Sequence, residues 1–143
     1  MPNDKSIEQV LDGYRDAVGA KDVGAFTNLY DEDVVVFDMW GPWSYDGLGS
    51  WRNSVTEWFG SLGDETVAVG FSETVVLDAD QTAAVHTQVS YMGMSLAGEE
   101  LRSMTNRLTW VLKRQDDSGW KIIHEHSSAP LDFETGKVVL NHQ

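Results

Sequence analysis

Hydrophobic positions repeat with the period of a helix in two stretches of the first half of the chain. Ser6 and Gln9 have the spacing of a capping box, and the apolar residues that follow recur at i, i+3 and i+4. These are Ile7, Val10, Leu11, Tyr14, Ala17 and Val18. A second repeat runs through Leu48, Trp51, Val55, Trp58, Phe59 and Leu62 and ends near Gly63. Each stretch predicts a helix with one buried face.

A shorter helix is expected between these two. Asp22 has the position of an N-cap, and Val23, Phe26, Leu29 and Tyr30 would form the inner face up to the acidic residues 31–33. Residues 34–37 are β-branched and aromatic, which predicts a strand, and Asp38 follows at its end. The segment from Met39 to Trp43 contains Gly and Pro and predicts a turn-rich connection.

From residue 66 onward the pattern changes to long segments rich in Val, Thr and aromatic residues. Turn signals at residues 78–80, 97–99 and 116–119 separate them, which predicts about four consecutive antiparallel strands. The element order is therefore ααβαββββ. It favours an α+β fold in which three helices pack on the concave face of a curved antiparallel sheet. Residues 137–140 were compatible with a short edge strand or with a segment draped over the domain.

Length and composition fit one domain and exclude several function classes. A chain of 143 residues forms one core, here a single domain over residues 1–143 with its core at about 6–131. The formal charge of −13 repels phosphate backbones and anionic lipids, so neither nucleic acid nor a membrane surface is an expected partner. Residues 1–8 lack the basic start and apolar run of a signal peptide, so a cytoplasmic location is expected. No cofactor is expected, and without cysteine neither a disulfide nor a thiolate metal site can form.

Four segments give the chain a resemblance to a known family. They are LYDEDVVVFD at residues 29–38, YDG at 45–47, EWF at 57–59 and WKIIHEHSS at 120–128. The sequence resembles the nuclear-transport-factor-2-like superfamily, and within it the SnoaL-like and ketosteroid-isomerase-like branch, over roughly residues 6–131. This resemblance implies a cone-shaped α+β barrel that encloses a pocket for a small hydrophobic organic molecule.

The resemblance also implies candidate catalytic residues. The tyrosine and the aspartate base of ketosteroid isomerases fall on Tyr14 and Asp38, and the protonated acid of their oxyanion hole falls on Arg107. A permanent cation cannot replace a neutral acid, so Arg107 would clamp an anionic group and ketosteroid isomerisation itself is not expected. Strand alternation alone would place Arg107 with Ser103, Thr105 and Thr109, opposite Leu108 and Trp110. The resemblance implies that this face lines the pocket, so Thr109 is also expected to bind the ligand.

The segment His124-Glu125-His126 requires a choice, because a strand directs both histidines to one face and Glu125 with Ser127 to the other. Similarity to kinase-association domains implies that Glu125 and Ser127 face the pocket. If the histidines pointed inward instead, His86 could complete a three-histidine metal site.

Aromatic residues gather around the connection between the first strand and the third helix. Trp40, Trp43, Tyr45, Trp51 and Trp58 are expected to build the core and the mouth of the cone, with Trp40 and Trp43 as a ligand wall or lid. Met92 is expected to fill space near the same cavity.

The leading hypothesis is an isomerase, cyclase or lyase that abstracts a proton from a small hydrophobic carbonyl compound. Asp38 would be the base, Tyr14 the hydroxyl donor and Arg107 the clamp. The alternatives are a noncatalytic module that binds a small ligand or assembles with partners, and a metal-dependent hydrolase that uses the three histidines. The outer face of the sheet is expected to form a homodimer, since it would otherwise expose a large apolar patch.

Overall fold

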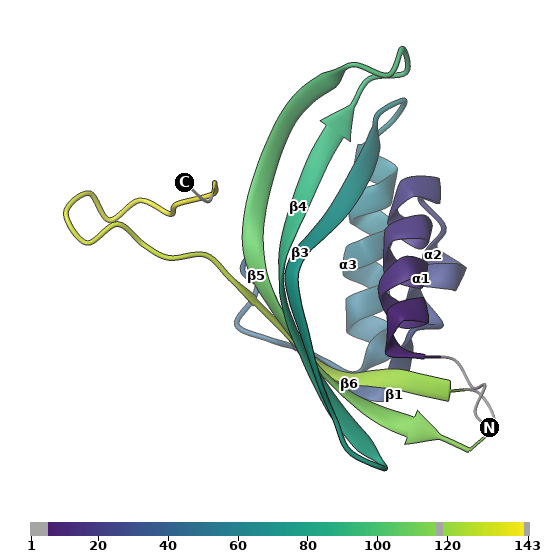
Figure 1. Cartoon of the computed structure of the whole chain (residues 1–143). Coiled ribbons are helices and arrows are strands. Elements are labelled where there is room, and N and C mark those ends of the chain that lie inside the picture. The colour runs from purple at the N-terminus through teal and green to yellow at the C-terminus, as the bar shows by residue number, and fades with distance from the viewer. Residues whose placement is uncertain (1–5, 117–118, 142–143) are drawn as a thin grey trace.

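The computed structural model describes residues 6–116 and 119–141, and in it three helices cover one face of a single curved sheet (Figure 1). The helices are α1 (Ile7–Ala20), α2 (Val23–Thr27) and α3 (Leu48–Ser61). The strands are β1 (Tyr30–Phe37), β2 (Tyr45–Asp46), β3 (Thr66–Asp78), β4 (Thr82–Met94), β5 (Glu100–Gln115) and β6 (Gly119–Ser128). This arrangement confirms the α+β cone. Residues 1–5 of the expected polar N-terminus and residues 117–118 of the expected last turn lie outside the described residues.

The sheet has the strand order β2-β1-β6-β5-β4-β3. The pairs from β3 to β6 are antiparallel, as the turn signals predict, and they form a meander. The pairing of β1 with β6 is parallel, which the expectation of a wholly antiparallel sheet did not include. Because of this pairing the ends of β1 and β6 lie side by side, with Phe37 opposite His126.

Helix α1 begins and ends where its sequence signals predict. The backbone N–H of Gln9 donates to the hydroxyl of Ser6, and the Gln9 side chain accepts from the Ser6 backbone N–H, so the capping box is formed. All six residues of the predicted apolar stripe are buried. At the other end Lys21 adopts a left-handed conformation, and its backbone N–H donates to the carbonyls of Ala17 and Val18.

The boundary between α2 and β1 differs from the prediction. Asp22 caps α2 through the backbone N–H of Ala25, as expected, but the helix ends at Thr27 and Tyr30 already belongs to β1. The backbone N–H of Ile122 donates to the carbonyl of Leu29, so pairing with β6 begins before the acidic residues 31–33. Tertiary pairing here overrides the local helical pattern.

A short strand, β2, was not predicted. Its residues pair with β1, with Tyr45 opposite Val36 and Asp46 opposite Val35. The backbone N–H of Gly47 then donates to the carbonyl of Val34, and Gly47 has a φ of 89°, which a glycine adopts at little cost. This turn carries the chain directly into α3.

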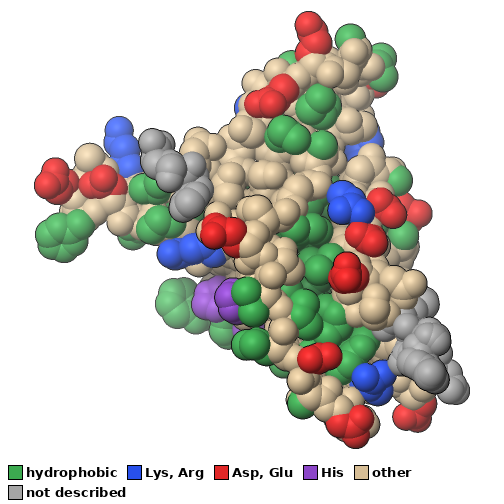
Figure 2. Space-filling view, in the orientation of Figure 1, with side chains coloured by type: hydrophobic (Ala, Val, Ile, Leu, Met, Phe, Trp, Pro, Cys, Tyr) green, Lys and Arg blue, Asp and Glu red, His purple; other side chains and the backbone are tan. Residues whose placement is uncertain are grey.

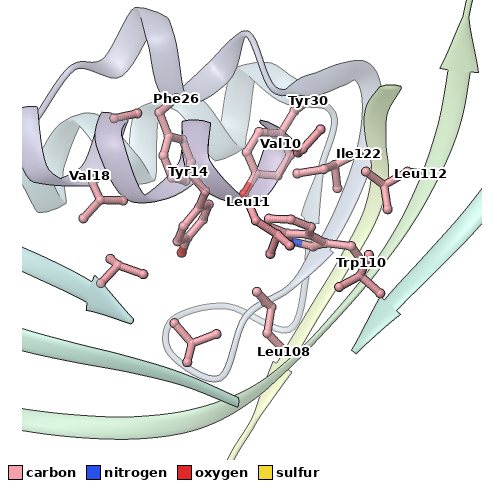
Figure 3. Close-up of a cluster of buried hydrophobic side chains, with 14 of the residues drawn as sticks. Val10, Leu11, Tyr14, Val18, Phe26, Tyr30, Leu108, Trp110, Leu112 and Ile122 are labelled. Atoms are coloured by element: carbon pink, nitrogen blue, oxygen red, sulfur yellow. The ribbon is translucent and has the colours of Figure 1, made fainter. Parts of the chain in front are cut away.

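The core lies between the helices and the concave face of the sheet. Tyr14 and Phe26 extend from the helices toward Trp110 on β5 (Figure 3). The ring of Tyr14 lies 5.2 Å from that of Phe26 and 5.6 Å from that of Trp110, measured between centroids. These contacts fix the position of the Tyr14 hydroxyl group relative to the sheet.

The C-terminal segment forms an arm that projects from the side of the sheet opposite the helices (Figure 1). We use the term arm for residues 130–140. Leu131 and Val138 form an isolated antiparallel bridge, and the Leu140 carbonyl accepts a hydrogen bond from the backbone N–H of Thr105 on β5. The segment is thus neither an edge strand nor draped over the domain.

Among the described residues, no helix is both long and apolar enough to span a membrane.

Candidate functional site

A buried carboxyl group, that of Glu125, lies on the concave face of the sheet. Strand β6 directs Glu125 and Ser127 inward, where they are 2% and 4% exposed, and leaves His126 exposed. This is the orientation expected from the resemblance to kinase-association domains. A carboxyl group at such a position must find hydrogen-bond donors, because burial without them is costly.

Two donors contact the same oxygen of Glu125. The Tyr30 hydroxyl donates to Oε1 at 2.5 Å, and Nε1 of Trp110 donates to it at 2.9 Å. Burial nevertheless raises the pKa of Glu125 to about 7, since these hydrogen bonds offset only part of the desolvation, and nearby Asp38 raises the pKa further. Glu125 can therefore gain or lose a proton near neutral pH.

Two tyrosine hydroxyl groups form a pair close to this carboxyl group. The hydroxyl groups of Tyr14 on α1 and Tyr91 on β4 lie 2.8 Å apart. Burial raises the pKa of both phenols well above the ordinary value, and the charge of Glu125 raises them further. Both phenols consequently remain protonated and can donate hydrogen bonds.

Asp38 lies at the end of β1 with both carboxylate oxygens engaged. Oδ2 accepts from the backbone N–H of Trp40 at 3.1 Å, and Oδ1 accepts from the Ser127 hydroxyl at 3.2 Å. That hydroxyl itself accepts from the backbone N–H of Met39. Burial raises the pKa of Asp38, although the hydrogen bonds from Trp40 and Ser127 lower it. Ser127 thus ties the carboxylate to the inner face of β6.

Tyr14 and Asp38 both interact with Tyr91, the first through a hydrogen bond and the second through its charge. Among residues 6–116 and 119–141 no hydrogen bond joins Tyr14 to Asp38, whereas the charge of Asp38 contributes to the raised pKa of Tyr91. The two carboxyl groups also interact, because Asp38 raises the pKa of Glu125. The site is therefore a cluster of the carboxyl groups of Asp38 and Glu125 and the hydroxyl groups of Tyr14, Tyr30 and Tyr91.

Arg107 does not face this cluster. The prediction that its side chain points into the pocket and clamps a ligand there is therefore wrong. Its side chain is exposed on the outer face, and its Nε donates to the hydroxyl of Ser128. Thr109, two residues further on, is exposed on the same face and was also wrongly placed in the pocket. Strand alternation decides both orientations, since Leu108 and Trp110 are buried.

The inward position next to Arg107 belongs to Asn106. Asn106 is 6% exposed, its Nδ2 lies 3.4 Å from the sulfur of Met39, and its Oδ1 is buried without a hydrogen-bond partner. An unpaired buried acceptor is unusual and is available to a ligand donor. The sequence offered a signal for it, because Asn106 alternates in phase with Leu108 and Trp110.

The three candidate histidines, His86, His124 and His126, lie on the outer face of the sheet and not in the pocket. His86, Thr109 and His126 lie opposite one another on β4, β5 and β6, so two strand spacings, about 10 Å, separate the two histidines. His124 points to the outer face as well, where the rings of both β6 histidines pack on Phe37. No cluster of potential metal ligands occurs in the described part of the chain. The three-histidine hypothesis required inward-pointing histidines, and this orientation is not found.

The aromatic residues divide between core and surface. Trp51 is buried and packs on Phe26, Tyr30 and Tyr45, while Trp58 is half-buried beside Phe59 and Tyr91. Trp40 and Trp43 are exposed in the loop after Asp38, and Trp43 is 97% exposed. Met92 follows the inward-facing Tyr91 and so lies on the opposite face of β4, contrary to expectation.

Two hollows of about 570 and 510 Å³ lie outside this cluster. One is lined by the ends of β3 and β4, and the other lies between α2, the start of β1 and α3. Neither is lined by Tyr14, Asp38 or Glu125.

Comparisons with known proteins agree on the fold. A family model described as a SnoaL-like domain matches residues 7–132. An NTF2-like protein of unknown function from Pseudomonas putida KT2440 is 24% identical, with a TM-score of 0.83 over 96% of this chain and 93% of that one. A nuclear transport factor 2 (NTF2-like) superfamily protein from Salmonella enterica is 14% identical, with a TM-score of 0.71 over 91% and 92%. No curated protein matches the chain.

Proposed function

Because this chain belongs to the SnoaL-like domain family, we propose that it is an enzyme that moves a proton on a small hydrophobic carbonyl compound, as an isomerase, cyclase or lyase does. The observation that carries the proposal is the pairing of Glu125, whose pKa is raised to about 7, with Asp38 beside it. Two interacting carboxyl groups in different surroundings are suited to hold and exchange a proton near neutral pH.

Asp38 would act as the base. It is less buried than Glu125 and lies beside the exposed loop that carries Trp40 and Trp43, so a substrate reaches it first. Removal of a proton from the carbon next to a carbonyl leaves the electron pair of the C–H bond to form an enolate. Asp38 would then return the proton to the same or to another carbon, so that the carboxyl group ends unchanged.

The hydroxyl pair of Tyr14 and Tyr91 would stabilise the enolate oxygen. Because both phenols keep their protons, one can donate to the other while that one donates to the substrate. Asn106 lies on the same inner face, and its amide would help to orient a polar group of the substrate. The exposed Trp40 and Trp43 would cover the hydrophobic part.

A noncatalytic module that binds a small ligand is the second candidate. It is favoured by the close ring packing around Tyr14 and by the position of the two hollows away from the cluster. In that case Glu125 and Asp38 would serve to hold the strands and the loop together, and replacing either would change stability without any loss of turnover.

Proton transfer on a probe ketone distinguishes the two candidates. Conversion of cyclohex-3-enone to cyclohex-2-enone needs only the removal and return of one proton, and ultraviolet absorbance follows it. In deuterated buffer, NMR would also report exchange of the protons next to the carbonyl in cyclohexanone. The purified protein should accelerate at least one of these reactions, and Asp38→Asn should abolish the acceleration without unfolding the protein. Asp64→Asn, at an exposed carboxylate in the turn after α3, is the matched control. Equal rates with wild type and Asp38→Asn would remove the enzymatic proposal.

A further inference from the structure

The arm presents apolar side chains that the described part of the chain leaves exposed. Phe133 at its tip is fully exposed, and Leu131 is 69% exposed. Figure 2 shows the arm extending from the body of the molecule, with hydrophobic side chains along it. Large apolar side chains held in solvent this way are typical of a surface that another molecule contacts.

The arm has a defined shape. In its bend, Oδ1 of Asp132 accepts from the backbone N–H groups of Glu134 and Thr135. Along its two limbs, the backbone N–H of Asp132 donates to Lys137 and that of Val139 donates to Pro130. A segment already ordered in this way loses little conformational entropy when it docks.

The outer face of the sheet, on the side from which the arm projects, is free of acidic side chains over most of β4, β5 and β6. The only acidic residues in these three strands are Glu100, at the first position of β5, and Glu125, which points inward. The exposed residues of this face include His86, Arg107 and His126. The face is thus neutral to basic, although the chain carries a formal charge of −13.

The arm complements this face in charge and in polarity. Phe133 lies between Asp132 and Glu134, which are acidic, whereas Arg107 supplies a positive charge on the face. Phe37 and the two β6 histidines form an aromatic surface there, on which a phenylalanine ring can pack. Two molecules of this chain repel each other through their net charge, so association is most favourable where acidic side chains are absent.

We propose that two copies of the chain exchange their arms, each Phe133 packing on the outer face of the other copy near Thr109 and His126. The arm does not serve its own face in this way, because the described residues of the chain leave Phe133 fully exposed. Exchange of identical arms makes the interface symmetric, with each copy giving and receiving the same contact. Phe133 is the anchor of this interface, and the acidic residues beside it set its register.

Replacement of Phe133 tests the proposal on the full chain by sedimentation velocity at micromolar concentration. The wild type should be a dimer, and Phe133→Ser should raise the dissociation constant at least about 30-fold, as expected for loss of an anchoring aromatic residue. Leu96→Ser is the matched control, since Leu96 is 82% exposed in the turn between β4 and β5. It should dimerise as the wild type does. A monomeric wild type, or a dimer that tolerates Phe133→Ser, overturns the proposal.

Cross-linking identifies the receiving surface. Because the chain contains no cysteine, single cysteines can be introduced without background reaction. Glu134→Cys mixed with Thr109→Cys should give a cross-linked dimer with a short bismaleimide, while Glu134→Cys mixed with Asp64→Cys should give little. Equal cross-linking in both mixtures, or none in the first, would show that the arm does not dock on the outer face.

Discussion

The hydroxyl of Tyr30 donates a 2.5 Å hydrogen bond to Glu125, a residue 95 positions away in the chain. Tyr30 opens β1 and Glu125 lies within β6, so the contact depends on the parallel pairing of these two strands. It holds a buried carboxyl group in one position and limits the rise of its pKa. Several measurable properties follow from this relationship.

The stability of the protein should fall as the pH rises from about 4.5 to about 7. Glu125 keeps its proton in the folded state up to a pKa of about 7, whereas the unfolded chain loses it near pH 4.5. The folded state thus binds more protons than the unfolded chain in this window. The free energy of unfolding therefore falls with each pH unit, and the total loss between pH 4.5 and pH 7 is roughly 3 kcal/mol. Glu125→Gln should remove this dependence and be the more stable form at pH 8. Urea unfolding of both proteins at pH 5 and pH 8 measures the difference; parallel pH profiles would contradict the prediction.

Tyr30→Phe should raise the pKa of Glu125 further. The hydrogen bond from Tyr30 lowers that pKa, and its removal leaves Trp110 as the remaining donor. We expect a loss of about 1–3 kcal/mol in the free energy of unfolding, since a buried acceptor loses its partner. NMR titration of the carboxyl carbon of Glu125 would report the shift directly. Tyr45→Phe is the control, because its half-buried hydroxyl contacts Ser54 and not a carboxyl group.

Tyr14→Phe and Tyr91→Phe should have effects that do not add. Each substitution breaks the same 2.8 Å hydrogen bond, so the double variant should lose little more stability than either single one. If the pair also stabilises an enolate, each variant should slow turnover of the probe ketone about 10-fold or more. Additive stability losses would indicate that the two hydroxyl groups act independently.

Asn106 and Arg107 should differ sharply in their influence on the site. Arg107→Ala leaves the concave face unchanged and should keep turnover within about 2-fold, because the arginine is exposed on the outer face. Asn106→Leu replaces a buried amide and should weaken binding of any ligand that contacts its free oxygen. Isothermal titration with cyclohexanone would compare the two variants. A stronger effect from Arg107→Ala would place the binding site on the other face.

The sequence was sufficient to predict the helices and the long strands, because their signals are local. The stripe from Ile7 to Val18 has a strict helical period, and its capping box forms as expected. The turn signals likewise located the strands of the meander.

The candidate site was predicted only in part, because its contacts join distant segments. Tyr30 appeared to close a helix, and Tyr91 was one aromatic residue among several in a long strand. Their roles depend on strand pairing that no local pattern specifies. Arg107 was misplaced by a single position, since a shift of one residue reverses the face of a strand. There the alternation of Leu108 and Trp110 was a better guide than the family resemblance.

The parallel pairing of β1 with β6 also constrains how the molecule acquires its site. β1 precedes the long strands in the chain, yet its parallel neighbour β6 follows β3, β4 and β5. Until β6 has been synthesised, Asp38 lacks the hydroxyl of Ser127 as a donor and Tyr30 lacks the carboxyl group of Glu125 as an acceptor. The helices and the hairpins from β3 to β5 can collapse earlier, but the cluster of carboxyl and hydroxyl groups assembles only after β6 has been synthesised, and nascent chains released before residue 128 would lack it.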